Sequence, residues 1–382
     1  MSVTEEPQTQ GAAPAQPASS KEASPLKGLV SLIRTARREG REPLENYGWF
    51  GPDSVARRVW SYPTVATIGF SRAVVVEELD PFLVATVKQS SKIYSQARVR
   101  YARTVRYFAT LAFSDSKTIA HAADVLIKVH SRASSPEPVS GLLSDPNNPD
   151  EQLWIHITGW HSVLYAYELF GPGKLSPADE DRYWAECAIA AEAQTIDTDK
   201  LPRNREEVRD YFNRMRPRLA ASEATQEAMA HLMSADVALP EVPLYMRPGA
   251  LFVSWAIRHA VISSLPRYQR ELGNVDHPLW MDVAIRPLMR VTHAAVNANT
   301  ELKLALLGVL APGTVGVAGP TLRGIEPLSD EVLTPEQTWA RHGVTPPREA
   351  YEELKQDQST ILFSPSAPLT PEQAEVWAVP GR

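Results

Sequence analysis

The sequence of 382 residues contains one cysteine, Cys187. A single cysteine excludes an intrachain disulfide and any cysteine cage for zinc or an iron–sulfur cluster. It lies in the alanine-rich run ECAIAAEA, where we expect a small packed side chain. An excess of one charge is also missing, because 39 basic and 45 acidic side chains give a net charge of only −6. This small negative net charge argues against binding to a nucleic acid.

Long hydrophobic runs are missing too. No stretch has the roughly 18 uninterrupted apolar residues that a spanning helix needs. The N-terminus lacks the basic-then-apolar pattern of a secretory signal. These absences predict a cytoplasmic protein and leave peripheral membrane contact open. The amphipathic stretch LKGLVSLIRTARREGRE is expected to pack against the domain as a short helix; the alternative is that it lies on an anionic membrane.

Strand signals are few, and the apolar content of 43% can supply a sizeable core. Most of the chain shows helical periodicity, including 244–265 and 279–310. The sequence therefore predicts a single all-α, multi-helix domain over 27–342. Residues 1–26 are rich in Pro, Ala, Gln and Ser and are expected to be disordered. Residues 343–382 are rich in proline and are expected to form an extended or partly disordered arm.

Several catalytic motifs do not occur. The sequence has no Walker-type phosphate loop, no Gly-x-Gly-x-x-Gly after a strand and no His-Glu-x-x-His. It also lacks paired Glu-x-x-His motifs for a di-iron bundle and a Gly-x-Ser-x-Gly elbow. With these catalytic motifs absent, two kinds of site remain possible for an all-α chain: a haem pocket or a site for a lipophilic ligand.

Residues 97–130 are the most informative stretch, and they predict two helices that meet at Ser114-Asp115. In the first, four-residue spacing stacks Arg100 with Thr104 and Arg103 with Tyr107. In the second, His130 continues an apolar stripe. Such a pair can hold an anionic cofactor whose metal needs an imidazole. The alternative is that His130 is a packed core histidine.

The stretch EQLWIHITGWHSVLYAYELFG is apolar on nearly every side and predicts a central helix. His156, Trp160 and Tyr167 fall in one row on it. They are candidates to line a cofactor cavity, with a plain core role as the alternative. A haem iron needs only one axial histidine, and its propionates favour arginine.

Several ordered blocks between about 43 and 275 resemble the MpaB/rubber-oxygenase family, which includes the latex clearing proteins. They are YGWFGPDSVARRVWSYPTV, RYARTVRYFATLAFSD followed by a helix that ends in VH, DEQLWIHITGWHSVLYAYELFGPGKLSPADEDRYWAE, LPRNREEVRDYF and LPRYQRELG. The resemblance implies a globin-like helical core. In the latex clearing proteins it also implies a haem b that cleaves an isoprenoid double bond with dioxygen.

The family's Arg-x-x-Lys-Thr motif falls here on Arg100, Arg103 and Thr104, and its proximal haem histidine on His130. The family's lysine is therefore an arginine, which cannot bind iron because a guanidinium is never deprotonated. Relatives often have His-Pro where this chain has Asp80-Pro81. The distal acid of the rubber enzymes has no aligned partner, and the nearest candidates are Glu77, Glu78 and Asp80.

Together these observations predict a haem-dependent oxygenase that acts on an apolar, unsaturated small molecule with dioxygen. His130 would bind the iron, Arg100 would pair with a propionate or orient bound oxygen, and Thr104 would donate a hydrogen bond. The alternative, from a different class, is a helical binding protein without catalysis that holds a lipid or a partner's helix.

Overall fold

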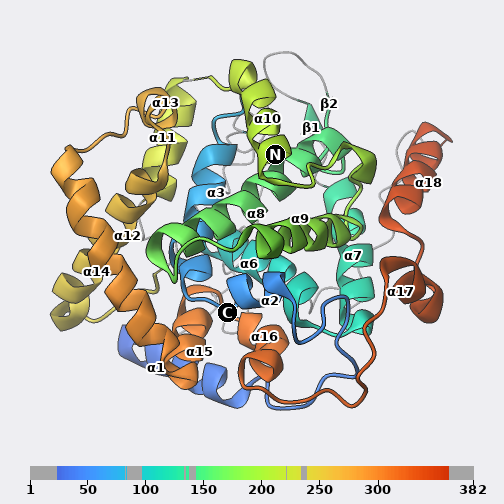
Figure 1. Cartoon of the computed structure of the whole chain (residues 1–382), viewed down its shortest axis with the longest axis horizontal. Coiled ribbons are helices and arrows are strands. Elements are labelled where there is room, and N and C mark those ends of the chain that lie inside the picture. The colour runs from blue at the N-terminus through green and yellow to red at the C-terminus, as the bar shows by residue number, and fades with distance from the viewer. Residues whose placement is uncertain are drawn as a thin grey trace, which may run out of the picture.

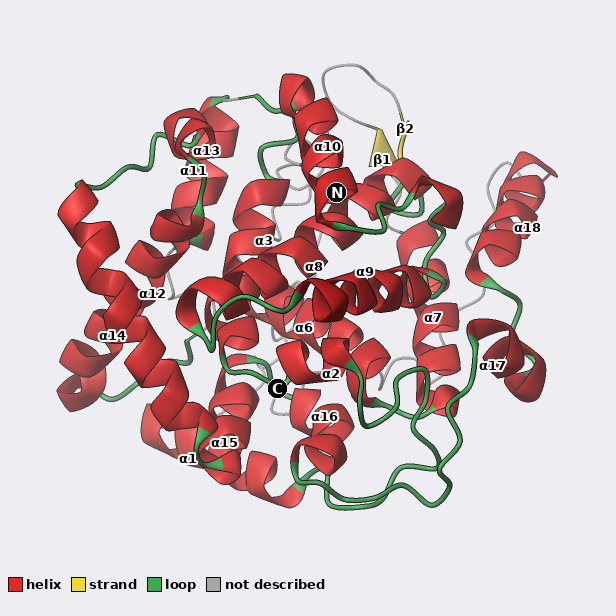
Figure 2. Ribbon diagram, viewed as in Figure 1, coloured by secondary structure: helices red, strands yellow, loops and turns green. Residues whose placement is uncertain are grey.

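The structure, a computed structural model, describes residues 24–81, 83, 97–132, 135–136, 143–220, 222–233 and 239–360. These residues are almost entirely helical (Figures 1 and 2). The exception is an antiparallel ladder in which β1 (Ser135–Pro136) pairs with β2 (Leu143–Ser144). The predicted all-α class is confirmed. Most of the segment predicted to be disordered, 1–26, lies outside the described residues.

Helix α8 (Pro149–Phe170) runs through the centre of the molecule (Figure 1). Asn148 caps its first turn by accepting a hydrogen bond from the Asp150 amide, and Gly171 ends it. Because α8 is apolar on nearly every side, it can be covered all round. Its neighbours are α3 (Phe70–Glu77), the π-helix η1 (Val65–Gly69), α2 (Val55–Trp60), α9 (Pro177–Ala191), α12 (Arg247–Ser264) and α14 (Leu279–Asn297).

The predicted helix pair is α6 (Ala97–Phe113) and α7 (Ser116–Ser131). The Asp115 side chain caps α7 by accepting a hydrogen bond from the Thr118 amide. The loop before α2 holds this corner, since Asn46 accepts from the Ser116 amide at 3.0 Å and donates to the Ser116 hydroxyl. Gly48, at φ +67°, brings its backbone so close that a Cβ would collide with the carbonyl oxygen of Ser114.

The remaining elements surround this centre. They are α1 (Pro25–Arg38), η2 (Thr198–Lys200), α10 (Arg205–Met215), η3 (Arg216–Arg218), α11 (Glu223–Leu232), η5 (Leu244–Met246), α13 (Arg267–Leu272), α15 (Thr300–Leu310), α16 (Thr314–Leu322), α17 (Pro335–His342) and α18 (Pro347–Thr360). Helix α1 packs against α15, as expected for the amphipathic stretch at the start of the domain.

Two sequence expectations are corrected. The stretch 279–310 divides into α14 and α15, because Asn299 leaves the helical conformation and caps α15 by accepting from the Leu302 amide. The arm expected to be extended begins instead with α18, which packs against α7. Pro347 occupies the first position of α18, where proline favours a helix and removes no hydrogen bond. The rest of the arm, from 361, lies outside the described residues.

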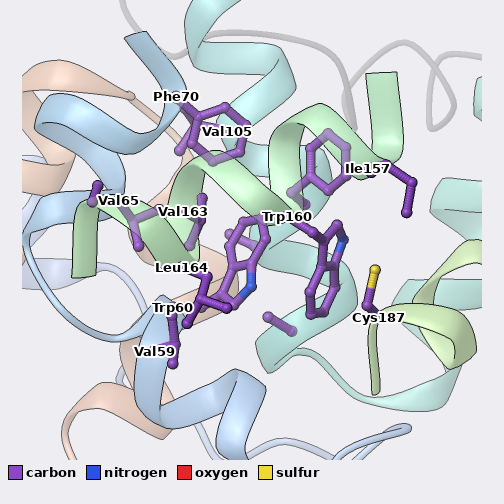
Figure 3. Close-up of a cluster of buried hydrophobic side chains, with 14 of the residues drawn as sticks. Val59, Trp60, Val65, Phe70, Val105, Ile157, Trp160, Val163, Leu164 and Cys187 are labelled. Atoms are coloured by element: carbon purple, nitrogen blue, oxygen red, sulfur yellow. The ribbon is translucent and has the colours of Figure 1, made fainter. Parts of the chain in front are cut away.

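Aromatic side chains fill the space between α2, α6, α8 and α9 (Figure 3). Trp160 is 1% exposed, and its ring centroid lies 5.1 Å from that of Trp60 and 5.2 Å from that of Tyr183. The Tyr183 hydroxyl donates to the Trp160 carbonyl at 2.8 Å, which ties α9 to α8. This cluster is therefore a packed core.

We expect Trp160→Ala to lower the free energy of unfolding by about 3–5 kcal/mol, because it leaves a cavity that rigid neighbours cannot fill. Urea denaturation monitored by circular dichroism measures the change. Leu328→Ala is the control, since this side chain is 75% exposed and its loss should change stability by less than about 0.5 kcal/mol. Equal stabilities of the two variants would contradict the packing described for Trp160.

Candidate active site

A cavity of about 290 Å³ lies beside α8, with walls from α3, α6 and α7. Side chains of η1, α11, α12 and α15 complete the described lining. Most lining side chains are aliphatic or aromatic, and the polar ones are contributed by η1, α3, α6, α7 and α8 and by the residues that follow α3 and α9. A concave, largely apolar space with a few convergent polar groups is the usual form of a small-molecule site.

Helix α6 contributes Arg100 and Thr104, which line the cavity one turn apart as their spacing predicts. Arg100 is exposed and Thr104 half-buried, so the guanidinium lies near the mouth of the cavity. Two tyrosines on the same helix also line it. The Tyr101 hydroxyl donates to the Ala66 carbonyl at 2.7 Å, and the Tyr107 hydroxyl donates to the Ala193 carbonyl at 2.8 Å. These bonds tie α6 to the π-helix and to the end of α9.

The π-helix η1 forms another wall, through Ala66 and Thr67. The Thr67 hydroxyl lies 2.8 Å from Nε2 of His293 on α14, so this wall is joined to the outer helices. A π-turn is rare and often marks a functional site, because the extra residue re-aims the side chains around it.

Helix α7 contributes His130, whose Nδ1 lies 3.3 Å from Nε2 of Gln152 on α8. The Gln152 amide is oriented by a second bond, since its oxygen accepts from the Thr195 amide at 3.0 Å. Asn147 holds the end of α7 by donating to the Ile127 carbonyl at 3.0 Å. His130 is thus fixed by residues from α8 and from the segments flanking α8 and α9.

Burial lowers the pKa of His130 to about 4, although Asn147, Asp145 and the Pro146 carbonyl raise it in part. A charged imidazolium loses more hydration on burial than a neutral ring does. At neutral pH the ring is therefore uncharged, which is the form that binds a metal.

Two acids face the same cavity from the end of α3. Burial raises the pKa of Glu77 to about 8, with a further contribution from the charge of Glu78. Burial also raises the pKa of Glu78 to about 7. Arg100 lowers both values without cancelling the effect of burial. Carboxyl groups with pKa values near neutrality can bind and release protons under physiological conditions.

Some polar atoms in the lining lack a protein partner. Glu78 is only 7% exposed and Gln194 only 5%. Their atoms Oε2 and Oε1, respectively, have no hydrogen-bond partner among the described residues. An unpaired buried polar atom costs about 1–3 kcal/mol, so such atoms indicate a ligand or water that pairs with them.

The other predicted site residues lie elsewhere. His156 is fully buried, and its Nε2 lies 2.9 Å from the Cys187 carbonyl oxygen. Trp160 (Figure 3) and Tyr167 are in the core cluster, and neither of them is in the described lining of the cavity. His156 is also outside that lining. Arg103 is exposed and is also outside that lining. The structure thus brings together Arg100, Thr104 and His130 and separates the rest.

Residues 57–323 match the family described as ER-bound oxygenase mpaB/B'/Rubber oxygenase, catalytic domain. The chain belongs to this family. The matched range contains every residue placed around the cavity, including the acids of α3 and the histidine of α7. A search of curated proteins and a search of solved structures found no match.

Asp80 is one of the three nearby candidates for a distal acid, with Glu77 and Glu78. Asp80 is buried in an ion pair with Arg218 at 3.3 Å and does not line the cavity, whereas the two glutamates do. Gln152 and Gln194 were not anticipated. Gln152 precedes His156 by four residues, so helical spacing would have grouped them; Gln194 lies in a turn and gives no such signal. No group of three or more His, Cys, Asp and Glu that could hold a bare metal ion occurs among the described residues.

Replacing Glu78 by glutamine should stabilise the protein at high pH. The folded-state pKa of about 7 exceeds the ordinary 4.5, so this carboxyl favours folding at low pH and loses that contribution as pH rises through 7. Relative to the wild type, Glu78→Gln should gain about 1–3 kcal/mol between roughly pH 5 and pH 8.5. The buried histidines act equally on both proteins and cancel. Glu353→Gln, at an exposed position on α18, is the control, and a pH-independent difference would contradict the burial of Glu78.

Proposed function

We propose that the protein is a cytoplasmic haem-dependent oxygenase for an apolar, unsaturated small molecule. The observation that supports it is the shared cavity, which brings a neutral imidazole, His130, together with a guanidinium, Arg100. One imidazole suffices for haem iron, and a guanidinium suits a propionate. Bound haem b would supply the binding and activation of dioxygen, which no amino-acid side chain provides.

The donor set fits this group. We assign the iron to Nε2 of His130, which leaves the ring proton on Nδ1, 3.3 Å from the Gln152 amide nitrogen. That nitrogen is itself a donor, so an acceptor must take its place beside Nδ1. The Pro146 carbonyl and the Asn147 side chain, whose hydrogen bonds raise the pKa of His130, can supply it. Such an acceptor is the usual partner of a metal-bound histidine and fixes its tautomer.

Arg100 and Thr104 would act on the charged and polar parts of the bound molecules. We assign Arg100 to a propionate or to bound oxygen, because it lies near the mouth of the cavity and remains a cation at any physiological pH. The Thr104 hydroxyl can donate one hydrogen bond inside the cavity. Arg103 cannot bind iron in place of the family's lysine. Because Arg103 is exposed, we assign it no role in the cavity.

Glu77 and Glu78 would move protons. Near pH 7 Glu78 is close to half-ionised and can accept a proton, whereas Glu77 is mostly protonated and can donate one. The aliphatic lining excludes water around the reacting carbons and favours an alkene over a polar substrate.

We expect the purified protein to take up haem with one-to-one stoichiometry and to show a Soret band. His130→Ala should lose that band. His121→Ala should keep it, because His121 lies on α7 but outside the described lining. His156→Gln should also keep it if the protein folds, which circular dichroism checks. A colourless wild type that takes up no haem would refute the proposal, and tight binding of a fluorescent fatty acid by that protein would support the non-catalytic alternative.

Arg100→Ala should weaken haem affinity by about tenfold or more, since a charge-assisted hydrogen bond contributes about 1.5–3 kcal/mol. Arg103→Ala is the matched control on the same helix and should leave the affinity unchanged. Competition with apomyoglobin measures both. Oxygen uptake with farnesol, compared with its fully hydrogenated analogue, tests the need for a double bond. Equal affinities of the two variants would remove the role assigned to Arg100.

A further inference from the structure

Exposed hydrophobic side chains gather on one part of the molecule. Twelve of the 17 large hydrophobic side chains exposed among the described residues lie on two segments. We call them the apolar face. On α14 they are Leu279, Trp280, Val283, Leu288 and Val291; on η5 and the first half of α12 they are residues 244–246, 251–253 and 255. Helices α12 and α14 pack against each other and form the left edge of the molecule in Figure 1.

The outer side of α14 is largely apolar because its charged side chains bond to neighbouring segments; Asp282 and Arg286 are half-buried, and Arg290 is exposed. Asp282 pairs with Arg270 at 3.2 Å and lies 2.7 Å from Nε2 of His277. Arg286 donates to the Ser263 hydroxyl at 3.2 Å, and Arg290 donates to the Leu169 carbonyl at 2.9 Å. These are the three charged residues of α14. What remains outside is a hydrophobic stripe along a helix of 19 residues, about 28 Å long.

The side chains of the apolar face are more exposed than hydrophobic side chains on a protein surface usually are. Val283 is 75% exposed, Val291 70%, Leu251 63% and Phe252 56%. Scattered exposed hydrophobic residues are common, but a contiguous stripe across two packed helices marks an interaction site.

Charge and residue type distinguish the possible occupants. Residues 244–297 carry six arginines and three acids, a net charge of +3 in a chain of net charge −6. Two copies of this face would therefore bring like charges together, whereas an anionic surface attracts it. Aromatic side chains with a polar tip, here Tyr245, Trp255 and Trp280, favour the boundary between lipid headgroups and hydrocarbon.

We propose that the apolar face seats on the surface of an anionic lipid bilayer, with α14 lying in the plane of the membrane. No described helix is both long and apolar enough to cross a bilayer. The face instead has the features of a peripheral contact: hydrophobic side chains along one side of a helix, with the exposed Arg247 and Arg290 on the same two helices. This inference does not depend on bound haem.

Flotation of the full-length protein with vesicles tests it. Wild-type protein should float with vesicles of phosphatidylcholine and phosphatidylglycerol and should bind pure phosphatidylcholine more weakly. Leu251→Ser/Phe252→Ser and Val283→Ser/Val291→Ser should each lower binding by about tenfold or more, because each removes two side chains from contact with lipid. Leu328→Ser, equally exposed but outside the apolar face, should bind like the wild type.

Arg247→Gln separates the electrostatic part of the contact. It should weaken binding to the anionic vesicles while leaving binding to pure phosphatidylcholine unchanged. Since the substituted side chains are exposed, circular dichroism should show every variant folded.

Three results would overturn the proposal. One is wild-type protein that floats with neither kind of vesicle. Another is binding that both serine double variants retain in full. The third is a dimer, detected by sedimentation equilibrium, that the double variants abolish while the wild type fails to float, because the face would then be an interface between copies.

Discussion

Loss of hydration is the constraint on which the chemistry of the cavity depends. The same burial keeps His130 neutral and raises the pKa of two carboxyl groups into the neutral range. Each change follows mainly from the cost of holding a charge away from water, and the charge of Glu78 adds to it at Glu77. The positive charge of Arg100 moderates the effect at both acids. Burial by the side chains around the cavity thus sets the protonation states of His130, Glu77 and Glu78.

The walls keep their positions through hydrogen bonds between segments that are distant in the sequence. Asn46 fastens the turn between α6 and α7, and Gln152 and Asn147 fasten the far end of α7. The helix that carries His130 is therefore held at both ends. Tyrosines of α6 reach the π-helix and the end of α9, so the wall with Arg100 is anchored too.

Local signals in the sequence predicted much of this arrangement. The cap at Asp115 is local, since its side chain accepts a hydrogen bond from the amide of Thr118, three residues on. Helical spacing placed Arg100 and Thr104 together for the same reason. Helical spacing also predicts that the His156 side chain points into the protein, and it does. Spacing does not predict which group the side chain contacts there, which is the Cys187 carbonyl. The contacts of Gln194 and Thr195 depend on how turns fold back, which no periodicity records.

Helix α12 has two sides with different surroundings. Ile257 lines the cavity, while Leu251 and Phe252 of the same helix point to the outside of the protein. A small shift of this helix changes both surfaces at once, because a packed helix moves as a rigid rod. Thermodynamic reciprocity then applies: if filling the cavity favours one position of α12, whatever binds its outer side in that position must favour filling of the cavity by the same factor. In that case α12 would link filling of the cavity to binding at the apolar face.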